Sequence, residues 1–378
     1  MWKVRCARLA AMRAKWTAAG LAVVALGAAW GAPAQSAPRH YSVKKSIWGP
    51  VNFNGRSQFP IYHDLGVGIW QDAINWDQVA PSRPASPRDP ADPAYQWPAE
   101  LDQAVREARK YRIRIALQIR FAPTWANGGR APNWAPSRAS DFADFLKAAA
   151  RRYPTVKLWM IWGEPSRRQN FMPLTPERPG SRRLTTAQAA APRRYARLLD
   201  ASYAALKAVS SRNEVIGGNT FTAGDINPYN WVRYMRLPNG RRPRMDLYGH
   251  NPFTGRRPRR NAPQDTAVVD ISDLPTFTRF LDRNLRGPHR HRLKLFLSEF
   301  FWPTDHANNE FPFHLTLRTQ ASWLADALRI TRSSRRIFTL GWYSLYDDPP
   351  EADGRSVNRG LMRRSGERKP AYRVFRGG

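Results

Sequence analysis

Eight short apolar runs, most of them followed by a loop and a segment of helical periodicity, constrain the fold of this chain more than any other feature of its sequence. The runs lie at residues 44–53, 65–74, 112–120, 157–163, 214–221, 245–253, 294–301 and 337–345. Near-continuous apolar strands are typical of a parallel sheet that is covered on both faces. Helical patterns lie between them at 99–111, 140–153, 191–210 and 316–334, and Ser140 is the predicted cap of the second.

This alternation predicts an α/β fold, a (β/α)8 TIM barrel that forms a single domain over residues 44–378. A chain of 378 residues, 42% of them hydrophobic, is long enough to fill such a core. The alternative is a doubly wound sheet, but the glycine-rich phosphate turn that normally follows its first strand is not in the sequence. In a barrel, the chemistry is expected at the C-terminal ends of the strands.

The first 34 residues have the pattern of a signal peptide. The basic stretch MWKVRCARLAAMRAKW precedes the apolar TAAGLAVVALGAAWGA, and cleavage is expected after Ala34. Residues 35–43 then form a short linker. The alternative is an uncleaved anchor, but the apolar run is short for a membrane span of about 20 residues. We expect a secreted or periplasmic protein without stable membrane association and, since Cys6 is the only cysteine, without disulfides.

The chain is strongly basic, with 61 Lys and Arg against 29 Asp and Glu, and only ten of the basic residues are lysines. A net charge of +32 attracts polyanions such as nucleic acid, anionic lipid surfaces or acidic polysaccharides. Export and the lack of a nucleic-acid-binding motif argue against nucleic acid. The alternative is a bias toward arginine on a solvated surface. The sequence is silent on the oligomeric state.

Two glutamates end predicted strands: Glu164 follows KLWMIWG, and Glu299 lies in LFLSEFFW. Two carboxyl groups at one barrel mouth suit retaining glycoside hydrolysis, in which they stand roughly 5–5.5 Å apart. Glu164 is the predicted acid/base, with a pKa raised by its apolar neighbours Trp162 and Pro165, and Glu299 is the predicted nucleophile. For either residue alone, a loop salt bridge is the alternative.

Five segments resemble the glycoside hydrolases of clan A, in particular family 39 (β-xylosidase and α-L-iduronidase types) and the related bacterial exopolysaccharide glycosidases often grouped with families 5 and 39. The segments are IWGEP, LSEFFW, FAPTWA (121–126), TQASWLADAL (319–328) and the tail from GWYSLYDDP to KPAYRVF (341–375). Their order and spacing extend the resemblance over roughly residues 44 to 375. The resemblance implies a carbohydrate substrate and the roles given above to the two glutamates.

Gly163 departs from the pattern of that group. Clan A enzymes usually carry an asparagine immediately before the acid/base, and its amide holds the 2-hydroxyl of the sugar, a contact that strengthens in the transition state. Either another residue takes this role, or the substrate lacks the contact, or catalysis is weakened. Gln169 and Asn170 lie further along the loop. A glycan-binding barrel with little or no catalysis is therefore a second hypothesis.

Several residues at or after strand ends are candidates for substrate binding. Flat indole faces stack on pyranose rings, and the resemblance makes Trp342 the first candidate, with a buried core position as the alternative. His250 is a candidate to orient the nucleophile, with a satisfied core histidine as the alternative. The other aromatic candidates are Trp48, Trp125, Trp134 and Trp302.

Arginines are concentrated in two predicted mouth loops, 165–183, which begins with Arg167 and Arg168, and 254–260, which holds four arginines and no acid. Since the guanidinium fork binds carboxylates, the hypothesis is an anionic glycan, for instance a uronate-containing polysaccharide. The alternative is chance clustering of an abundant residue. An extracellular polyanion-binding structural protein would explain the charge but not the paired glutamates. No cofactor or metal site is predicted, since HExxH is absent and HRH (289–291) lies in a basic stretch.

Overall fold

The computed structural model describes residues 42–178, 180–264, 267–287, 291–306, 313–350 and 356–378. The predicted signal segment, most of the predicted linker and His289 lie outside the described residues. Within them, no helix combines the length and the apolar character that crossing a bilayer requires.

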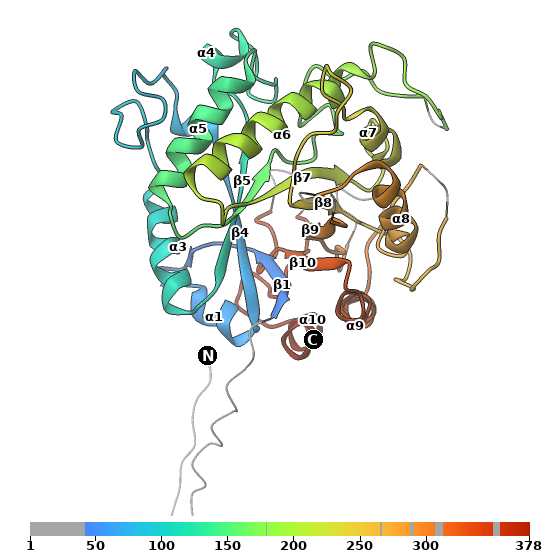
Figure 1. Cartoon of the computed structure of the whole chain (residues 1–378). Helices are drawn as coiled ribbons and strands as arrows, with labels where there is room; N and C mark the ends of the chain where they lie inside the picture. Colours follow the sequence, from blue (N-terminus) through green and yellow to red (C-terminus); the bar gives the residue numbers. More distant parts are fainter. Residues whose placement is uncertain (1–41, 179, 265–266, 288–290, 307–312, 351–355) are drawn as a thin grey trace, which may run out of the picture. The chain divides into compact units, whose positions relative to one another are not determined.

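Eight parallel strands close into a barrel in the order β1-β10-β9-β8-β7-β6-β5-β4 (Figure 1). All eight predicted runs correspond to these strands, so the predicted (β/α)8 fold is confirmed. The strands are β1 (Ser42–Trp48), β4 (Val67–Asn75), β5 (Arg114–Arg120), β6 (Leu158–Ile161), β7 (Glu214–Phe221), β8 (Leu247–Asn251), β9 (Lys294–Phe300) and β10 (Ile337–Tyr343). A separate antiparallel pair, β2 (Asn52–Phe53) and β3 (Arg56–Ser57), follows β1.

A helix follows each barrel strand and packs outside it. These helices are α1 (Phe59–Asp64), α3 (Ala99–Lys110), α5 (Ala139–Arg152), α6 (Ala190–Val209), α7 (Pro228–Tyr234), α8 (Leu274–Asn284), α9 (Leu317–Ser333) and α10 (Pro370–Gly377), and the short α2 (Trp76–Val79) and α4 (Thr124–Asn127) lie in loops. The predicted cap Ser140 is wrong: α5 begins at Ala139, and Ser140 lies in its first turn. The residue before the helix is Arg138, whose guanidinium donates to Asp141 at 2.9 Å.

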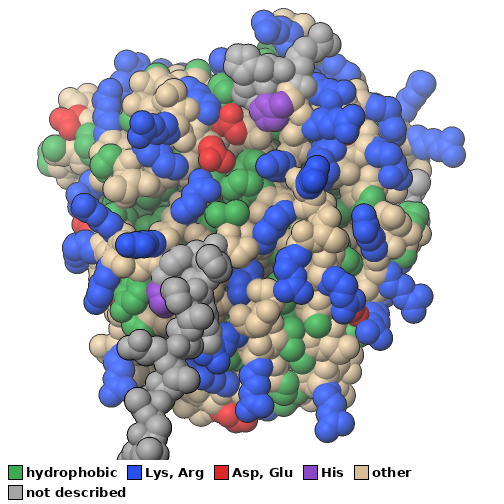
Figure 2. Space-filling view, turned by 60° about the horizontal axis from the view of Figure 1, so that its bottom comes forward, with side chains coloured by type: hydrophobic (Ala, Val, Ile, Leu, Met, Phe, Trp, Pro, Cys, Tyr) green, Lys and Arg blue, Asp and Glu red, His purple; other side chains and the backbone are tan. Residues whose placement is uncertain are grey.

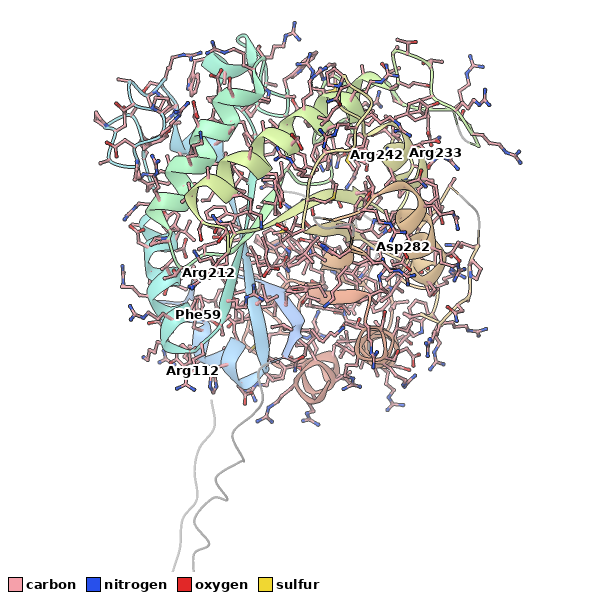
Figure 3. All side chains as sticks on the ribbon, in the orientation of Figure 1. Phe59, Arg112, Arg212, Arg233, Arg242 and Asp282 are labelled. Atoms are coloured by element: carbon pink, nitrogen blue, oxygen red, sulfur yellow. The ribbon has the colours of Figure 1, made fainter. Side chains whose placement is uncertain are left out.

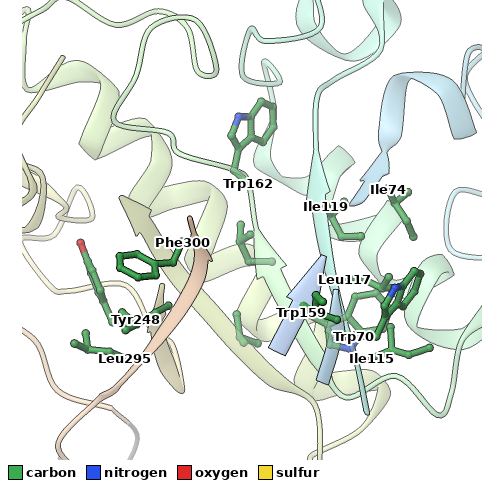
Figure 4. Close-up of a cluster of buried hydrophobic side chains, with 14 of the residues drawn as sticks. Trp70, Ile74, Ile115, Leu117, Ile119, Trp159, Trp162, Tyr248, Leu295 and Phe300 are labelled. Atoms are coloured by element: carbon green, nitrogen blue, oxygen red, sulfur yellow. The ribbon is translucent and has the colours of Figure 1, made fainter. Parts of the chain in front are cut away.

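Side chains alternate along the strands between an outer and an inner core, because successive residues of a strand point to opposite faces. In β5, Ile115, Leu117 and Ile119 pack against the helices (Figure 4), whereas Ala116 packs inside the barrel. The inner apolar cluster comprises Trp48, Ile69, Ala116, Leu158, Met160, Ile216, Leu247 and Phe296. Further along β5, the same alternation places a polar residue, Gln118, on the inner face near the C-terminal end.

A buried ion pair fixes the C-terminal segment to the loop after β10. Lys369 Nζ lies 2.5 Å from Asp347 Oδ1 and also donates to Asn358 O at 3.1 Å. Burial raises the pKa of Asp347 and lowers the pKa of Lys369, while their attraction opposes both shifts.

Candidate active site

The chain turns sharply after β6 and places Glu164 at the C-terminal end of the barrel. Trp162 and Glu164 have φ values of 65° and 41°. Such left-handed conformations are uncommon for residues other than glycine and are concentrated at functional sites. Two hydrogen bonds hold the turn: Trp162 N donates to Ile119 O at 2.9 Å, and Asn219 Nδ2 donates to Trp162 O at 2.7 Å. As a result Glu164 is only 7% exposed.

Three side chains donate to the Glu164 carboxylate. Asn251 Nδ2 lies 2.9 Å from Oε1, Arg167 Nη1 lies 2.7 Å from Oε2, and Asn170 Nδ2 lies 3.3 Å from Oε2. The loop folds back because Arg167 N donates to Glu164 O and Asn170 N donates to Arg167 O, each at 3.0 Å. Spacing along the loop does not reveal this fold, which is why Asn170 was not a sequence candidate. The loop salt bridge considered for Glu164 is also present, as the pair with Arg167.

Asn251 connects the two glutamates. Its Nδ2 donates to Glu164, and its Oδ1 accepts the backbone N–H of Glu299 at 3.0 Å. Asn251 is the last residue of β8 and is 1% exposed. Strand alternation turns Asn251 inward and its neighbour His250 outward, a signal that the YGHNPF segment already contained.

Tyr343, the last residue of β10, is electrostatically coupled to Glu299. Burial, with the charge of Glu299 as the next cause, raises the pKa of Tyr343 to about 12. The phenol therefore stays neutral across the physiological range and can donate a hydrogen bond. The ring also packs 5.7 Å from the indole of Trp48. Glu299, Tyr343 and Trp48 thus approach one another from three neighbouring strands.

A polar layer lies beneath Trp48 inside the barrel. The Trp48 indole Nε1 and Gln71 Nε2 both donate to Ser298 O, at 3.0 and 2.9 Å. Ser298 Oγ in turn donates to Gln71 Oε1 at 3.0 Å. These bonds fix the backbone carbonyl of Ser298, the residue just before Glu299, and place the Trp48 indole beside it. The sugar-binding role of Trp48 stays a prediction.

Two of the tryptophan candidates, Trp342 and Trp302, are packed away from this mouth. Trp342 is 1% exposed and donates from Nε1 to Arg359 O at 3.2 Å. Trp302 is fully buried and donates from Nε1 to Thr254 O at 2.7 Å. Their indoles therefore belong to the outer core, and neither presents a face to a sugar. Pairing with β1 sets Trp342 beside the outward Ile47 and Tyr343 beside the inward Trp48, so alternation along β10 turns Trp342 away from the mouth.

His250 is the satisfied core histidine of the alternative interpretation. It is fully buried, its Nδ1 lies 2.9 Å from Thr220 Oγ1, and its Nε2 lies 2.8 Å from Val269 O. Since a carbonyl can only accept, Nε2 carries the proton. Burial lowers the pKa of His250 to about 4. Neither glutamate is among these partners.

The remaining two tryptophans are partly exposed and each has an arginine over its ring. The guanidinium of Arg83 lies 4.5 Å from the ring centroid of Trp125, whose Nε1 donates to Ala80 O at 2.8 Å. The guanidinium of Arg130 lies 4.2 Å from the ring centroid of Trp134. In this arrangement one face of each indole is already covered.

Most arginines that begin the two loops have acidic partners from elsewhere in the chain. Arg168 N donates to Asp225 at 2.8 Å, and the Arg168 side chain is 65% exposed. Arg256 pairs with Asp270 and Arg257 with Asp326, each at 2.7 Å. Of the predicted arginines, Arg167 is the one that the structure brings to a glutamate of the site.

No group of three or more His, Cys, Asp and Glu side chains that could hold a metal ion occurs among the described residues.

Solved structures similar to this chain include a family 39 glycoside hydrolase from the gut symbiont Bacteroides cellulosilyticus WH2, at 17% identity and a TM-score of 0.62, covering 89% of this chain and 63% of that one. The GH39 β-xylosidase of Caulobacter crescentus matches at 16% identity and 0.61, covering 89% of this chain and 71% of that one. Bacteroides uniformis β-glucuronidase 2 matches at 13% identity and a TM-score of 0.55, covering 90% of this chain and 35% of that one.

No family model and no curated protein matches this chain. The chain spans less than two thirds of the first of these structures. At such identities the likeness establishes the fold, and the predicted resemblance to glycoside hydrolases of the family 39 type is confirmed at that level.

Proposed function

We propose that this chain is a secreted glycoside hydrolase that cleaves an oligo- or polysaccharide with retention of configuration, through a two-glutamate double displacement. The observation that supports it best is Asn251, one side chain that bonds both to the Glu164 carboxylate and to the backbone of Glu299. A barrel fold shared with solved glycosidases adds to this support.

In the proposed first step, Glu164 gives its proton to the glycosidic oxygen while Glu299 attacks the anomeric carbon, so the C–O bond to the leaving group breaks and a glycosyl ester forms. In the second step Glu164 takes a proton from water, the water oxygen attacks the same carbon, and Glu299 is released. Asn251, Arg167 and Asn170 are all donors. They therefore match the ionised Glu164 that acts as base in the second step.

Azide rescue tests these roles on a panel of 2,4-dinitrophenyl β-D-xyloside, β-D-glucoside and β-D-glucuronide. These leaving groups need no protonation, so Glu164→Ala should stall at the glycosyl ester, and azide should release a glycosyl azide of retained configuration. Azide should rescue Glu299→Gly with inverted configuration, since it then attacks the substrate directly. Product stereochemistry is read by NMR.

The matched control is Glu214→Gln, which changes a barrel glutamate that begins β7 and pairs with Arg114. It should leave kcat/KM close to that of the wild type. A wild-type chain that binds glycans but hydrolyses no member of a broad panel would instead favour the glycan-binding barrel.

We further propose that the glycan is anionic. An open groove of about 510 Å³ is lined by Tyr234 and five exposed arginines, Arg182, Arg183, Arg193, Arg233 and Arg236, with no acid. None of these arginines forms an ion pair with any described residue. Arg182 and Arg183 belong to the loop that also carries Glu164, and Arg233 lies on α7 (Figure 3). Among the charged side chains on the face drawn in Figure 2, Lys and Arg are spread widely and few Asp or Glu are visible.

Turnover of neutral and uronate-bearing oligosaccharides at low and high salt tests this proposal. Arg182→Ser with Arg183→Ser should slow the uronate-bearing substrates only, and salt should do the same in the wild type. Arg106→Ser with Arg109→Ser, two exposed positions on α3, is the control. Equal turnover of both substrate classes without salt sensitivity would remove this part of the proposal.

Secretion is proposed from residues 1–34 alone. Expression of the full chain in a bacterial host, followed by mass analysis of the exported protein, should show cleavage after Ala34. A full-length product that stays in the membrane fraction would favour the anchor.

A further inference from the structure

The backbone does not explain why residue 163 is a glycine. Its neighbours Trp162 and Glu164 have positive φ, but Gly163 itself does not. A residue with a side chain could therefore adopt this backbone conformation without strain. The reason for the glycine has to lie in the space around it.

That space is filled by a side chain from the neighbouring strand. A Cβ atom at position 163 would lie 2.5 Å from Gln118 Oε1, 2.9 Å from its Cδ and 3.2 Å from its Nε2. Real Cβ contacts are not that short. The amide of Gln118 on β5 thus occupies the volume that a side chain at position 163 would need.

Gln118 is itself unpaired. Its side chain is buried, with 2% of the residue exposed, and it makes no hydrogen bond with any residue that the structure describes. Gln71, also buried in the barrel, bonds through both amide atoms to Ser298 and Ser46. Neither amide atom of Gln118 is among the fully enclosed unpaired polar atoms of the described residues, so the amide lies in the small part of this residue that solvent still reaches. A largely buried amide without a protein partner is free to bond to a ligand there.

We propose that Gln118 binds the substrate, through the hydroxyl on the sugar carbon next to the anomeric carbon, and that residue 163 is a glycine because Gln118 fills its side-chain space. This rests on the proposed function. An amide and a hydroxyl match, since each both donates and accepts. Gln118 lies beside the residue that precedes Glu164, so the nearest sugar hydroxyl to it is the one adjacent to the bond that Glu164 protonates. Hydrogen bonds to this hydroxyl strengthen in the transition state.

The first test measures kcat/KM of the wild type and of Gln118→Met on each 2,4-dinitrophenyl glycoside and on its 2-deoxy analogue. Methionine keeps the length of the side chain but removes the amide. For the hydroxyl substrate kcat/KM should fall about tenfold to a hundredfold, chiefly in kcat, because the lost bond is one to a polarised transition state. For the 2-deoxy substrate it should change less than about threefold. For each substrate, kcat/KM of the wild type is divided by that of Gln118→Met. Comparing this quotient between the two substrates cancels the greater intrinsic reactivity of 2-deoxy glycosides.

The second test moves the amide from position 118 to position 163. Gly163→Asn alone should lose activity, since its side chain meets the Gln118 amide. Gln118→Gly with Gly163→Asn places an amide in the same space from the other strand, and should recover discrimination between the two substrates. Thermal unfolding of each variant identifies any that fail to fold, and Gln118→Met keeps the test valid if the exchange does.

A loss of equal size on both substrates, or no loss on either, would overturn the proposal, because a structural amide or a water-bound one does not distinguish them. A wild type that hydrolyses nothing would overturn the proposed function first. The Kd values of phenyl thioglycosides with and without the 2-hydroxyl then decide: only a preference for the hydroxyl that Gln118→Met abolishes would support the role of Gln118. Absence of binding would overturn it.

Discussion

Replacing Asn251 with alanine removes both of the bonds that join the two glutamates. The bond from Nδ2 to the Glu164 carboxylate, at 2.9 Å, is of the charged kind that contributes about 1.5–3 kcal/mol. The second, in which Oδ1 accepts Glu299 N–H at 3.0 Å, leaves a buried donor unpaired at a cost of about 1–3 kcal/mol. Water that enters the vacated space can replace part of the lost hydrogen-bond energy. We therefore expect kcat/KM to fall about 100-fold, near 3 kcal/mol.

Asn251→Asp sharpens the prediction because it changes one bond and keeps the other. The aspartate can still accept from Glu299 N–H, but it faces Glu164 with a second carboxylate in place of a donor. Activity at neutral pH should be lower than in Asn251→Ala. It should rise relative to the wild type as the pH falls, since a protonated aspartic acid can donate to Glu164.

The assay is kcat/KM against pH on the best substrate of the panel, with urea unfolding of every variant. Asn213→Ala is the control, since Asn213 is as buried as Asn251 and donates to Leu206 O at 2.9 Å, outside the site. It should lower the free energy of unfolding and leave kcat/KM near that of the wild type. The reasoning fails if Asn251→Ala keeps kcat/KM within a factor of about three, or if Asn213→Ala loses as much.

Three further predictions concern stability. Burial holds the pKa of His250 at about 4, below its ordinary 6.5. The free energy of unfolding should therefore fall by about 3 kcal/mol as the pH falls from 6.5 to 4. In urea unfolding, the difference in stability between wild type and His250→Gln should narrow over the same pH range. Burial raises the pKa of Asp72 from 3.8 to about 6, which favours its neutral form in the folded state. The stability that this contributes is lost as the pH rises through 6, so the free energy of unfolding of Asp72→Asn should gain up to about 3 kcal/mol over wild type between pH 4 and 7. A constant difference across these pH values would refute the assignment. Lys369→Met leaves Asp347 buried without its partner and should cost about 3–5 kcal/mol of unfolding free energy, whereas adding Asp347→Leu should recover much of it; an equal loss in the single and double variants would contradict the pairing.

The positions of the two strand-end glutamates could be predicted from local sequence patterns. The apolar runs predict the barrel strands because burial on both faces demands continuous apolar sequence. A glutamate at the C-terminal end of such a run then has a place at the barrel mouth. Glu164 and Glu299 lie there, and their catalytic roles stay predictions until the rescue experiment is done.

Side-chain direction within a strand was harder to predict than the strand itself. His250 and Trp342 were chosen where their neighbours Asn251 and Tyr343 face the site. Adjacent residues of a strand point to opposite sides, so an error of one position exchanges core for mouth. In β10, the pairing of Trp342 with Ile47 and of Tyr343 with Trp48 shows which of the two faces the barrel interior, and this pairing cannot be read from the local sequence.

The sequence by itself determined the barrel, the two acidic strand ends and the unusual glycine before one of them, because each of these depends on residues close together in the chain. Only the tertiary structure decided which side chain fills the space beside the glycine and which amides contact the glutamates. Gln118 lies on β5 and Gly163 in the turn that follows the adjacent strand β6, and Asn251 contacts the Glu164 carboxylate from β8. Which side chains share a space depends on strand register and barrel closure, and these arise only when the whole chain is packed.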